Sequence, residues 1–410
     1  MTATSPLTLG RAWDLSDRLL ASIALACPDL HIVEPAGDMR RAEPLVGAIV
    51  LVGCTANPAA AIDALEAQLD LLTINSRSAN SLSGTYQHSV VEILIAQPHE
   101  FGSMMLEATG PDAHVRELFR RGLSHEPFAT ERDLYTSISL PFIAPELRKG
   151  TEEIDAAAAD RLPHLLEQDA IRGDLHMHTV YSDGRDSVAT MIEECAVLGY
   201  EYMAITDHSA GASASRTLAI DEIARQRDEI ESMRERFPRM TILHGAEVDV
   251  LPDGRLDFAD DILEQFDIVL ASMHERDRQS PRQLTKRTLE ALAHPLVNIL
   301  CHPANRLVGR SAGYALDFDA IYAAAAESGT ALEVDGAPSH IDLDGDRARA
   351  AAAAGATLVV DSDCHRVEAL RRQMGFGVGT ARRGWIEPNR VLNTRSIEEV
   401  LVFIAAKRAR

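Results

Sequence analysis

Residues 171–178 read IRGDLHMH, and this short run decides how we interpret the whole chain. Apolar residues lead into two histidines that stand two positions apart. On a β-strand, successive side chains point to opposite faces, so His176 and His178 emerge on one face while Met177 points away. Two imidazoles on one face can bind the same metal ion. The run therefore predicts a strand that ends at a metal site.

Five further runs in the second half of the chain have the same form, with apolar or β-branched residues leading into a histidine or a carboxylate. They are residues 202–208 (YMAITDH), 240–247 (MTILHGAE), 268–274 (IVLASMH), 297–302 (VNILCH) and 358–365 (LVVDSDCH). Helix-like segments such as residues 187–198 and 220–237 separate them. Alternating strands and helices predict an α/β fold with a parallel sheet or barrel, in which the carboxyl ends of the strands meet at one face.

Nine candidate metal ligands would then converge at that face. They are His176, His178, Asp183, His208, Glu247, His274, His302, Asp363 and His365. Imidazole and carboxylate ligands together suit zinc, manganese or iron. Because a catalytic ion takes roughly three to five protein ligands, this set predicts two or three ions, with Glu247 as the natural bridge. Closely spaced ions activate water and stabilise the oxygens of a phosphoryl displacement, so we predict a metal-dependent hydrolase.

Neighbouring residues of similar chemistry receive a structural interpretation. The remaining histidines, including His244 and His340, do not stand at predicted strand ends, so we expect them to be structural. Cys301 and Cys364 each precede a candidate ligand. Strand alternation would turn both thiols to the opposite face, which favours buried packing residues.

Composition bounds the class of protein. A chain of 410 residues is long enough for one large domain and a smaller one. Its net charge of -22 argues against nonspecific coating of nucleic acid, although a local basic groove remains compatible with it. The sequence shows no signal-peptide pattern and no apolar run of about 18 residues, so we expect no membrane contact. Five scattered cysteines without Cys-x-x-Cys spacing favour a cytoplasmic protein.

Several strings are specific enough to indicate a family. DLHMHTVYSDG (174–184), GAEVDVLPDGRLDF (245–258), CHPANRLVGR (301–310) and DSDCH (361–365) resemble the PHP (polymerase and histidinol phosphatase) family, and in particular the C-terminal PHP domain of bacterial family X DNA polymerases. The resemblance implies a distorted β/α barrel with a trinuclear site. By position, His176, His178, Glu247 and Asp363 resemble the ligands of the first ion, Glu247, His274 and His302 those of the second, and Asp183, His208 and His365 those of the third.

Two arginines follow His302 within the string CHPANRLVGR (301–310). Beside a cluster of cations, Arg306 and Arg310 are expected to bind phosphate oxygens. The alternative is that they are solvated loop residues or form ion pairs with nearby carboxylates.

The first half of the chain reads as a smaller α/β unit. We expect helices near residues 10–26, 59–71, 101–108 and 113–121, and strands near 48–53, 72–75 and 90–96. Residues 36–53 (AGDMRRAEPLVGAIVLVG) resemble the palm of family X polymerases, in which a Gly-Ser stretch with two arginines leads into a strand that carries paired catalytic aspartates.

This palm-like segment lacks the residues that nucleotidyl transfer requires. Asp38 stands at the serine position, and Ala48 and Val50 stand at the two aspartate positions, where they cannot hold magnesium. Glu92 is at best the third carboxylate, and we find no counterpart of the helix-hairpin-helix region with which such polymerases grip DNA. We therefore predict a degenerate, catalytically silent nucleotidyltransferase-like domain at 1–140, a connector at 141–170 and a PHP phosphoesterase domain at 171–410. An unrelated N-terminal α/β module is the alternative.

Three functions follow from this organisation. The first is a DNA 3'-5' exonuclease or 3'-end processing enzyme of DNA repair that lacks polymerase activity. The second is a small-molecule phosphatase of the histidinol-phosphatase type, which the acidic net charge favours. The third is a noncatalytic nucleic-acid-binding scaffold that keeps metals for folding. The expected substrates are thus DNA ends or a small phosphate ester, and the sequence indicates no protein partner.

Overall fold

The computed structural model describes residues 5–212, 214–275 and 278–409. The chain divides into two compact units, Met1–Pro163 and His164–Arg410. This division falls inside the segment 141–170 that we predicted as a connector. No helix in the described part of the chain is both long and apolar enough to span a bilayer.

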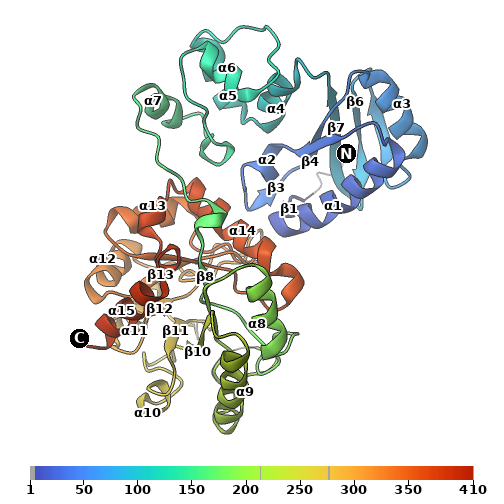
Figure 1. Ribbon diagram of the computed structural model, residues 1–410. Helices are drawn as coiled ribbons and strands as arrows, with labels where there is room; N and C mark the ends of the chain where they lie inside the picture. Colours follow the sequence, from blue (N-terminus) through green and yellow to red (C-terminus); the bar gives the residue numbers. More distant parts are fainter. Residues whose placement is uncertain (1–4, 213, 276–277, 410) are drawn as a thin grey trace. The chain divides into compact units, whose positions relative to one another are not determined.

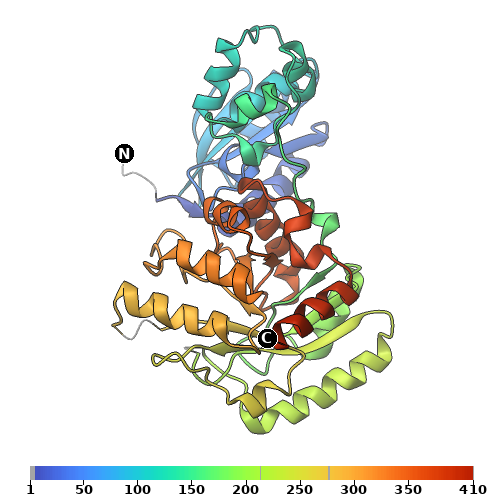
Figure 2. The same ribbon diagram turned by 90° about the vertical axis from the view of Figure 1, so that its left-hand side faces the viewer.

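The second unit is built around one parallel sheet of seven strands (Figure 1 and Figure 2). They are β8 (Gly173–Asp174), β9 (Tyr202–Ile205), β10 (Thr241–Asp249), β11 (Ile268–Ser272), β12 (Ile299–Leu300), β13 (Ala331–Asp335) and β14 (Leu358–Asp361). Each strand pairs with its neighbour in chain order. A parallel bridge between Met177 and Cys364 joins the continuations of the first and last strands, so the sheet nearly closes into a barrel. The predicted distorted β/α barrel is confirmed.

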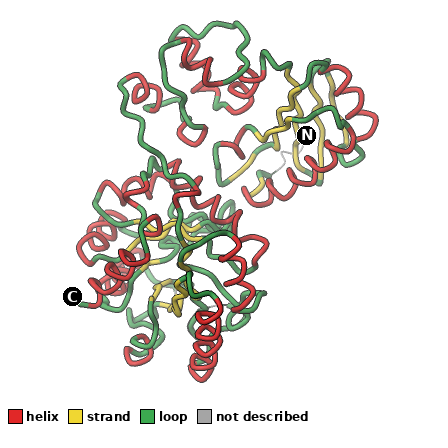
Figure 3. Tube along the Cα trace, viewed as in Figure 1, coloured by secondary structure: helices red, strands yellow, loops and turns green. Residues whose placement is uncertain are grey.

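Helices follow the strands around this barrel (Figure 3). They are α8 (Val188–Val197), α9 (Ile223–Arg236), α10 (Asp260–Leu263), α11 (Pro281–Ala293), α12 (Phe318–Ser328), α13 (Gly345–Ala353), α14 (Val367–Arg383) and α15 (Ile397–Arg408). Local chemistry starts several of them. Ser280 and Ser396 form capping boxes at α11 and α15, and caps of this kind stabilise a helix by about 1 kcal/mol.

Two layers of apolar side chains explain why the strands read as nearly continuous apolar runs. On β11, Val269 faces the layer between the sheet and the helices, while Leu270 faces the inside of the barrel. Val400 and Ile404 of α15 contribute to the inner layer. Because both faces of each strand are buried, strand position could be read from the sequence although strict alternation was absent.

One barrel strand was absent from our prediction. β13 has the sequence ALEVD, all five residues are buried, and it lies between β12 and β14. Its two carboxylates, Glu333 and Asp335, interrupt the apolar run, and none of the nine candidate ligands directly follows it. The pattern that identified the other strands therefore could not identify this one.

The first unit contains a mixed five-stranded sheet in the order β2-β4-β7-β6-β5, together with a two-stranded β1-β3 pair. Its elements are β1 (Leu7–Thr8), α1 (Leu9–Ala26), β2 (Ile32–Pro35), α2 (Gly37–Arg40), β3 (Leu45–Val46), β4 (Ile49–Cys54), α3 (Pro58–Gln68), β5 (Thr73–Arg77), β6 (Ser81–Tyr86), β7 (Ser89–Ala96), α4 (Phe101–Thr109), α5 (Asp112–Arg120), α6 (Glu131–Ser137) and α7 (Glu153–Ala158). The expected smaller α/β domain is present. We missed the two-residue strands β1 and β3, the edge strand β2, which has no buried residue, and β6, whose sequence SLSGTY buries only alternate residues.

Candidate metal centre

All nine residues that the sequence singled out lie at the carboxyl ends of the barrel strands. His176 and His178 follow β8, and Asp183 lies in the loop beyond them. His208 follows β9, and Glu247 stands in the second half of β10. The other four come after three later strands: His274 after β11, His302 after β12, and Asp363 and His365 after β14. Parallel strands bring these residues together although they span 190 positions of sequence.

Glu247 lies at the centre of the cluster, and its Oε2 atom faces three histidines. His208 Nδ1 lies 2.6 Å from Oε2, His176 Nε2 lies 3.4 Å away and His178 Nε2 3.5 Å away. Neither Oε2 nor His208 Nδ1 has a hydrogen-bond partner, although both are buried. Ligand atoms that converge without hydrogen bonding one another form an arrangement that a cation can satisfy.

The other oxygen of Glu247 faces a second pair of histidines. Oε1 lies 2.8 Å from His302 Nε2 and 3.5 Å from His274 Nε2. One carboxylate thus presents its two oxygens to two separate histidine groups. This geometry suits a bridging ligand between two ions.

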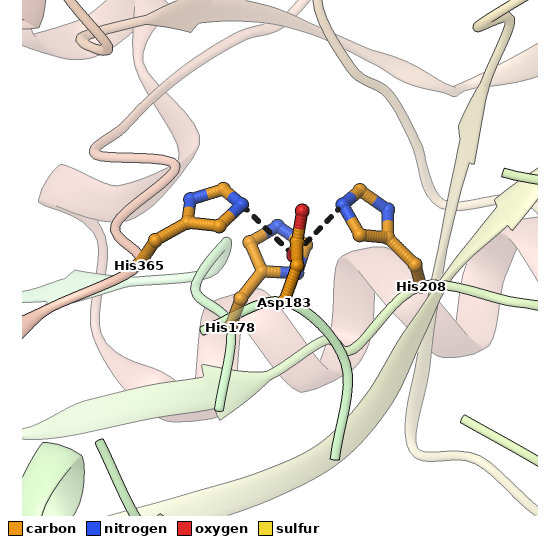
Figure 4. A group of neighbouring side chains, drawn as sticks. All are labelled: His178, Asp183, His208 and His365. Carbon is orange, nitrogen blue, oxygen red and sulfur yellow. Dashed lines mark ion pairs between the residues drawn. The ribbon is translucent and has the colours of Figure 1, made fainter. Parts of the chain in front are cut away.

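A further group surrounds Asp183 (Figure 4). Asp183 Oδ1 lies 3.2 Å from His365 Nε2 and 3.4 Å from His208 Nε2, and the figure shows the two rings on either side of the carboxylate. The His178 ring stacks on both of those rings, with centroids 4.2 Å apart in each case. One ligand atom from each of these four residues lies within 4.8 Å of every other, which fits a divalent cation.

The electrostatics of the cluster keep its central carboxylates ionised, whereas Glu247 and Asp183 raise the pKa of His302 and His365 to about 9 although burial opposes this, so a metal ion must displace the protons of these two rings. Burial alone would raise the pKa of Glu247, but the surrounding histidines, His208 foremost, hold it well below its usual range. Burial likewise opposes the ionisation of Asp183, yet the hydrogen bond from His365 lowers its pKa to about 2. Burial and the neighbouring His208 lower the pKa of His178 to about 3. At neutral pH these carboxylates are ionised and His178 is neutral, which are the ligand forms.

Glu333 of β13 is a site residue that sequence reasoning missed. Its side chain is fully buried, His176 Nδ1 donates a 2.6 Å hydrogen bond to Oε1, and the backbone N–H of His302 donates a 2.7 Å bond to Oε2. A carboxylate behind a metal-binding imidazole fixes its tautomer and orientation. Glu333 therefore directs His176 Nε2 toward the cluster. A carboxylate within an otherwise apolar strand was the signal that could have identified it.

Two more buried aspartates support the candidate ligands from behind. Asp249 Oδ1 accepts hydrogen bonds from the backbone N–H and Nδ1 of His274, at 3.1 and 3.0 Å. Asp207 accepts from the backbone N–H of Thr179 at 2.7 Å and of Ser182 at 3.1 Å, and so holds the loop that carries Asp183. Neither contact could be read from spacing alone.

Our expectation for one cysteine was wrong. Cys301 is buried, but its Sγ lies 3.4 Å from Glu247 Oε1 and so faces the cluster. His302 has a φ of +27°, which breaks the strand geometry on which the alternation argument depended. Cys364 is buried in the layer between sheet and helices, as expected.

The structure separates the two arginines of the 301–310 string. Arg306 Nε donates a 2.8 Å hydrogen bond to the carbonyl of His340, and its Nη1 lies 3.5 Å from Asp344 Oδ2. Its Nη2 is buried and has no hydrogen-bond partner. Arg310 is exposed. His340, which we expected to be structural, stacks on the His302 ring with centroids 5.6 Å apart, beside the candidate site.

In the first unit, Val50, which we predicted to stand at a catalytic aspartate position of family X polymerases, lies among apolar side chains. Val50 lies opposite Glu92 in the β4–β7 register, and a Cβ on Gly37 would lie 3.3 Å from Val50 Cγ2. Val50 packs there against a small core with Val52 and Met105. Two arginines of this unit, Arg40 in α2 and Arg41 just after it, form ion pairs with acidic residues.

These acids lie close to both guanidinium groups. Arg40 Nη2 lies 2.6 Å from Glu131 Oε2, and Arg41 hydrogen bonds to Asp38. Neighbouring carboxylates therefore compete with any phosphate for the two guanidinium groups.

Comparison with known proteins finds a PHP domain, a DNA polymerase/exonuclease and phosphatases among the proteins similar to this chain. The PHP domain family matches residues 174–335. DNA polymerase/3'-5' exonuclease PolX of Bacillus subtilis is 36% identical over 400 residues, which cover 91% of this chain and 69% of that protein. A probable phosphatase of Syntrophotalea carbinolica is 28% identical over 241 residues, covering 56% of this chain and 95% of its own length.

One solved structure matches about half of the chain at low sequence identity. It is histidinol phosphate phosphatase from Lactococcus lactis, complexed with zinc, L-histidinol and phosphate. It is 17% identical to this chain, covers 52% of it and 94% of its own length, and superposes with a TM-score of 0.41.

Proposed function

We propose that this chain, which belongs to the family of the DNA polymerase/3'-5' exonuclease PolX and contains a PHP domain, is a metal-dependent phosphoesterase acting on DNA 3' ends. The reaction would be 3'-5' exonucleolytic hydrolysis or the removal of a 3'-terminal phosphate. The observation that carries this proposal is the position of Glu247, whose two oxygens face two separate groups of histidines.

We assign the ligands to three ion positions. The first takes His176, His178, Glu247 and Asp363; the second takes Glu247, His274 and His302; the third takes Asp183, His208 and His365. The support is geometric: His178 Nε2 lies 3.0 Å from Asp363 Oδ1, and the Glu247 and Asp183 contacts collect the remaining rings. Zinc, manganese or iron suits this mixture of imidazole and carboxylate.

When bound, such ions would activate water and neutralise charge that develops on the phosphate oxygens. The chain's own residues hold the reactants in place. Glu333 and Asp249 orient ligand imidazoles, while Asp207 fixes the loop that carries Asp183. The unpartnered Nη2 of Arg306 supports a role for this residue in binding a phosphate oxygen, and the exposed Arg310 is suited to the next phosphate of a DNA strand.

We further propose that the first unit has no polymerase activity. Val50 packs against Gly37 and Met105 where nucleotidyl transfer needs a carboxylate, and neither Ala48 nor Val50 can hold magnesium. Arg40 and Arg41 form ion pairs with Glu131 and Asp38. Hydrolysis in the second unit is therefore the activity to test.

A small-molecule phosphatase is the second candidate. A relative named as a probable phosphatase matches over 95% of its own length while covering only 56% of this chain. That relative therefore matches about half of this chain with nearly its whole length. In that case the substrate would be a small phosphate monoester such as histidinol phosphate.

One parallel assay distinguishes these functions. Protein loaded with manganese is incubated with a 5'-labelled single-stranded oligonucleotide, a 3'-phosphorylated oligonucleotide and histidinol phosphate. The variant His176→Ala/His178→Ala should be inactive. The variant His31→Ala/His99→Ala removes two exposed histidines of the first unit and should behave as wild type.

Each outcome of this assay has a clear meaning. Ladder-like shortening or 3'-phosphate release supports the proposal. Turnover of histidinol phosphate alone shows that the protein is a small-molecule phosphatase. Hydrolysis that survives in the His176/His178 variant, or no hydrolysis of any substrate, refutes the assigned site.

A further inference from the structure

His340 lies at the candidate site but does not belong to any of its ligand groups. It stands in the loop between β13 and α13, and its ring stacks on that of His302, with centroids 5.6 Å apart and planes inclined by 30°. Among the described residues, no group of converging metal-binding atoms includes His340. His340 is therefore not among the candidate ligands, although its ring lies directly beside that of His302.

The polar atoms of His340 have no protein partner. Nδ1 is buried without a hydrogen bond, and no described residue hydrogen-bonds Nε2. A residue kept only for packing on His302 would lose the hydration of this buried Nδ1 without compensation, which a phenyl or aliphatic side chain would avoid. Unpartnered donors at the edge of a cation site are expected where a ligand oxygen will be received.

Backbone contacts hold this loop in place. Arg306 Nε donates to the carbonyl of His340 at 2.8 Å, and the Val308 N–H donates to the carbonyl of Ser339 at 2.8 Å. The loop 336–344 is thus tied to the segment that follows His302. Because the loop is already ordered, the ring can make a hydrogen bond to a ligand without the entropic cost of ordering the loop.

We infer that His340 is a further substrate-binding residue, which donates a hydrogen bond to a phosphate oxygen held at the ion of His274 and His302. The inference rests on the proposed phosphoesterase function and adds one named contact to it. Arg306 then has two roles, since its Nε positions the His340 loop while its Nη2 remains available to the same phosphate.

Two substitutions separate a polar role from a packing role. His340→Phe keeps a ring that can stack on His302 but removes both nitrogens, whereas His340→Gln keeps a donor near the position of Nε2 but removes the ring. The metal-loaded proteins are titrated with inorganic phosphate by calorimetry, and their ion content is measured by mass spectrometry. His302→Ala, which removes a proposed ligand, serves as the control for ion loss.

We expect His340→Phe to bind phosphate about 10- to 100-fold more weakly than wild type with unchanged ion content, because a hydrogen bond to a charged group is lost. His340→Gln should remain within about threefold of wild type. On the oligonucleotide substrate the loss in His340→Phe should appear mainly in KM.

Three results would overturn the inference. They are wild-type phosphate affinity in His340→Phe, a loss of ions in that variant as in His302→Ala, and no phosphate binding by the wild-type protein. If the wild-type protein binds phosphate but hydrolyses no ester, the proposed function fails, while the calorimetry still decides the role of His340.

Discussion

Changing Glu333 to glutamine should weaken metal binding, although Glu333 is not among the proposed ligands. The carboxylate accepts two buried hydrogen bonds, from His176 Nδ1 at 2.6 Å and from the backbone N–H of His302 at 2.7 Å. A glutamine amide has one accepting end and one donating end. It can therefore satisfy only one of the two donors.

Either orientation of the amide harms the site. If its NH2 group faces the backbone N–H of His302, two donors meet at about the same position. If it faces His176 Nδ1, the imidazole must carry its proton on Nε2, which is the atom that lies 3.4 Å from Glu247 Oε2 and is needed for the ion. Losing one hydrogen bond to a charged group costs about 1.5–3 kcal/mol, or about 10- to 100-fold in ion affinity.

The measurement is a zinc titration of metal-free protein in competition with a chromophoric chelator. Ion content is measured after gel filtration as a second readout. Glu327→Gln makes the same chemical change at an exposed position of α12 and should bind zinc as wild type does. If Glu333→Gln and Glu327→Gln have equal affinities and equal ion content, the argument that Glu333 orients His176 is refuted.

Three further predictions address other parts of the chain. Removing metal with a chelator should lower the Tm of the second unit, since an ion present at a hundredfold above its Kd contributes about 2.7 kcal/mol; scanning calorimetry should show a smaller change in His176→Ala/His178→Ala, and an unchanged wild-type Tm would contradict the assignment. Burial alone would raise the pKa of Glu153, but hydrogen bonds from His114 and the backbone hold it at about 2. Its stabilising contribution is therefore complete above its ordinary pKa of 4.5 and is lost as the pH falls from there toward 2. Acid unfolding of the first unit should be less steep over this window in Glu153→Gln, while the exposed Glu152→Gln should match wild type. Finally, the purified protein should incorporate no nucleotides on a primed template, and template-directed incorporation would show that our interpretation of Ala48 and Val50 is wrong.

The barrel and the PHP family could be predicted because two independent signals coincided. Buried parallel strands appear in the sequence as short apolar runs, and metal-binding residues stand where those runs end. The prediction of family and fold is confirmed. The nine predicted ligand residues lie together in the structure, and their roles as ligands remain predictions that the titrations above can test.

The roles of the supporting residues could not be predicted, because these roles depend on contacts across the barrel. Glu333 is 157 positions from His176, and nothing in the ALEVD strand indicates that partner. Cys301 faces Glu247 because the backbone departs from strand geometry at His302, with a φ of +27°. His340 lies in a loop whose position depends on backbone hydrogen bonds from Arg306 and Val308. Residue spacing predicts the direction of a side chain only on a regular strand. It does not predict contacts between distant strands or the positions of residues in loops.

The acidity of the chain is a weak guide to its substrate. Asp174 and Asp361 are fully buried on strands that lead to proposed ligands, Asp335 is fully buried on the neighbouring β13, and burial raises the pKa of Asp174 to about 6. Cations bound above them would favour their ionised forms, so part of the formal charge of -22 belongs to the site itself. A phosphate that approaches the barrel would meet the ions and Arg306 first. We therefore expect discrimination between a DNA end and a small ester to depend on the residues proposed to surround the ions, Arg306, Arg310 and His340, and not on the total charge of the chain.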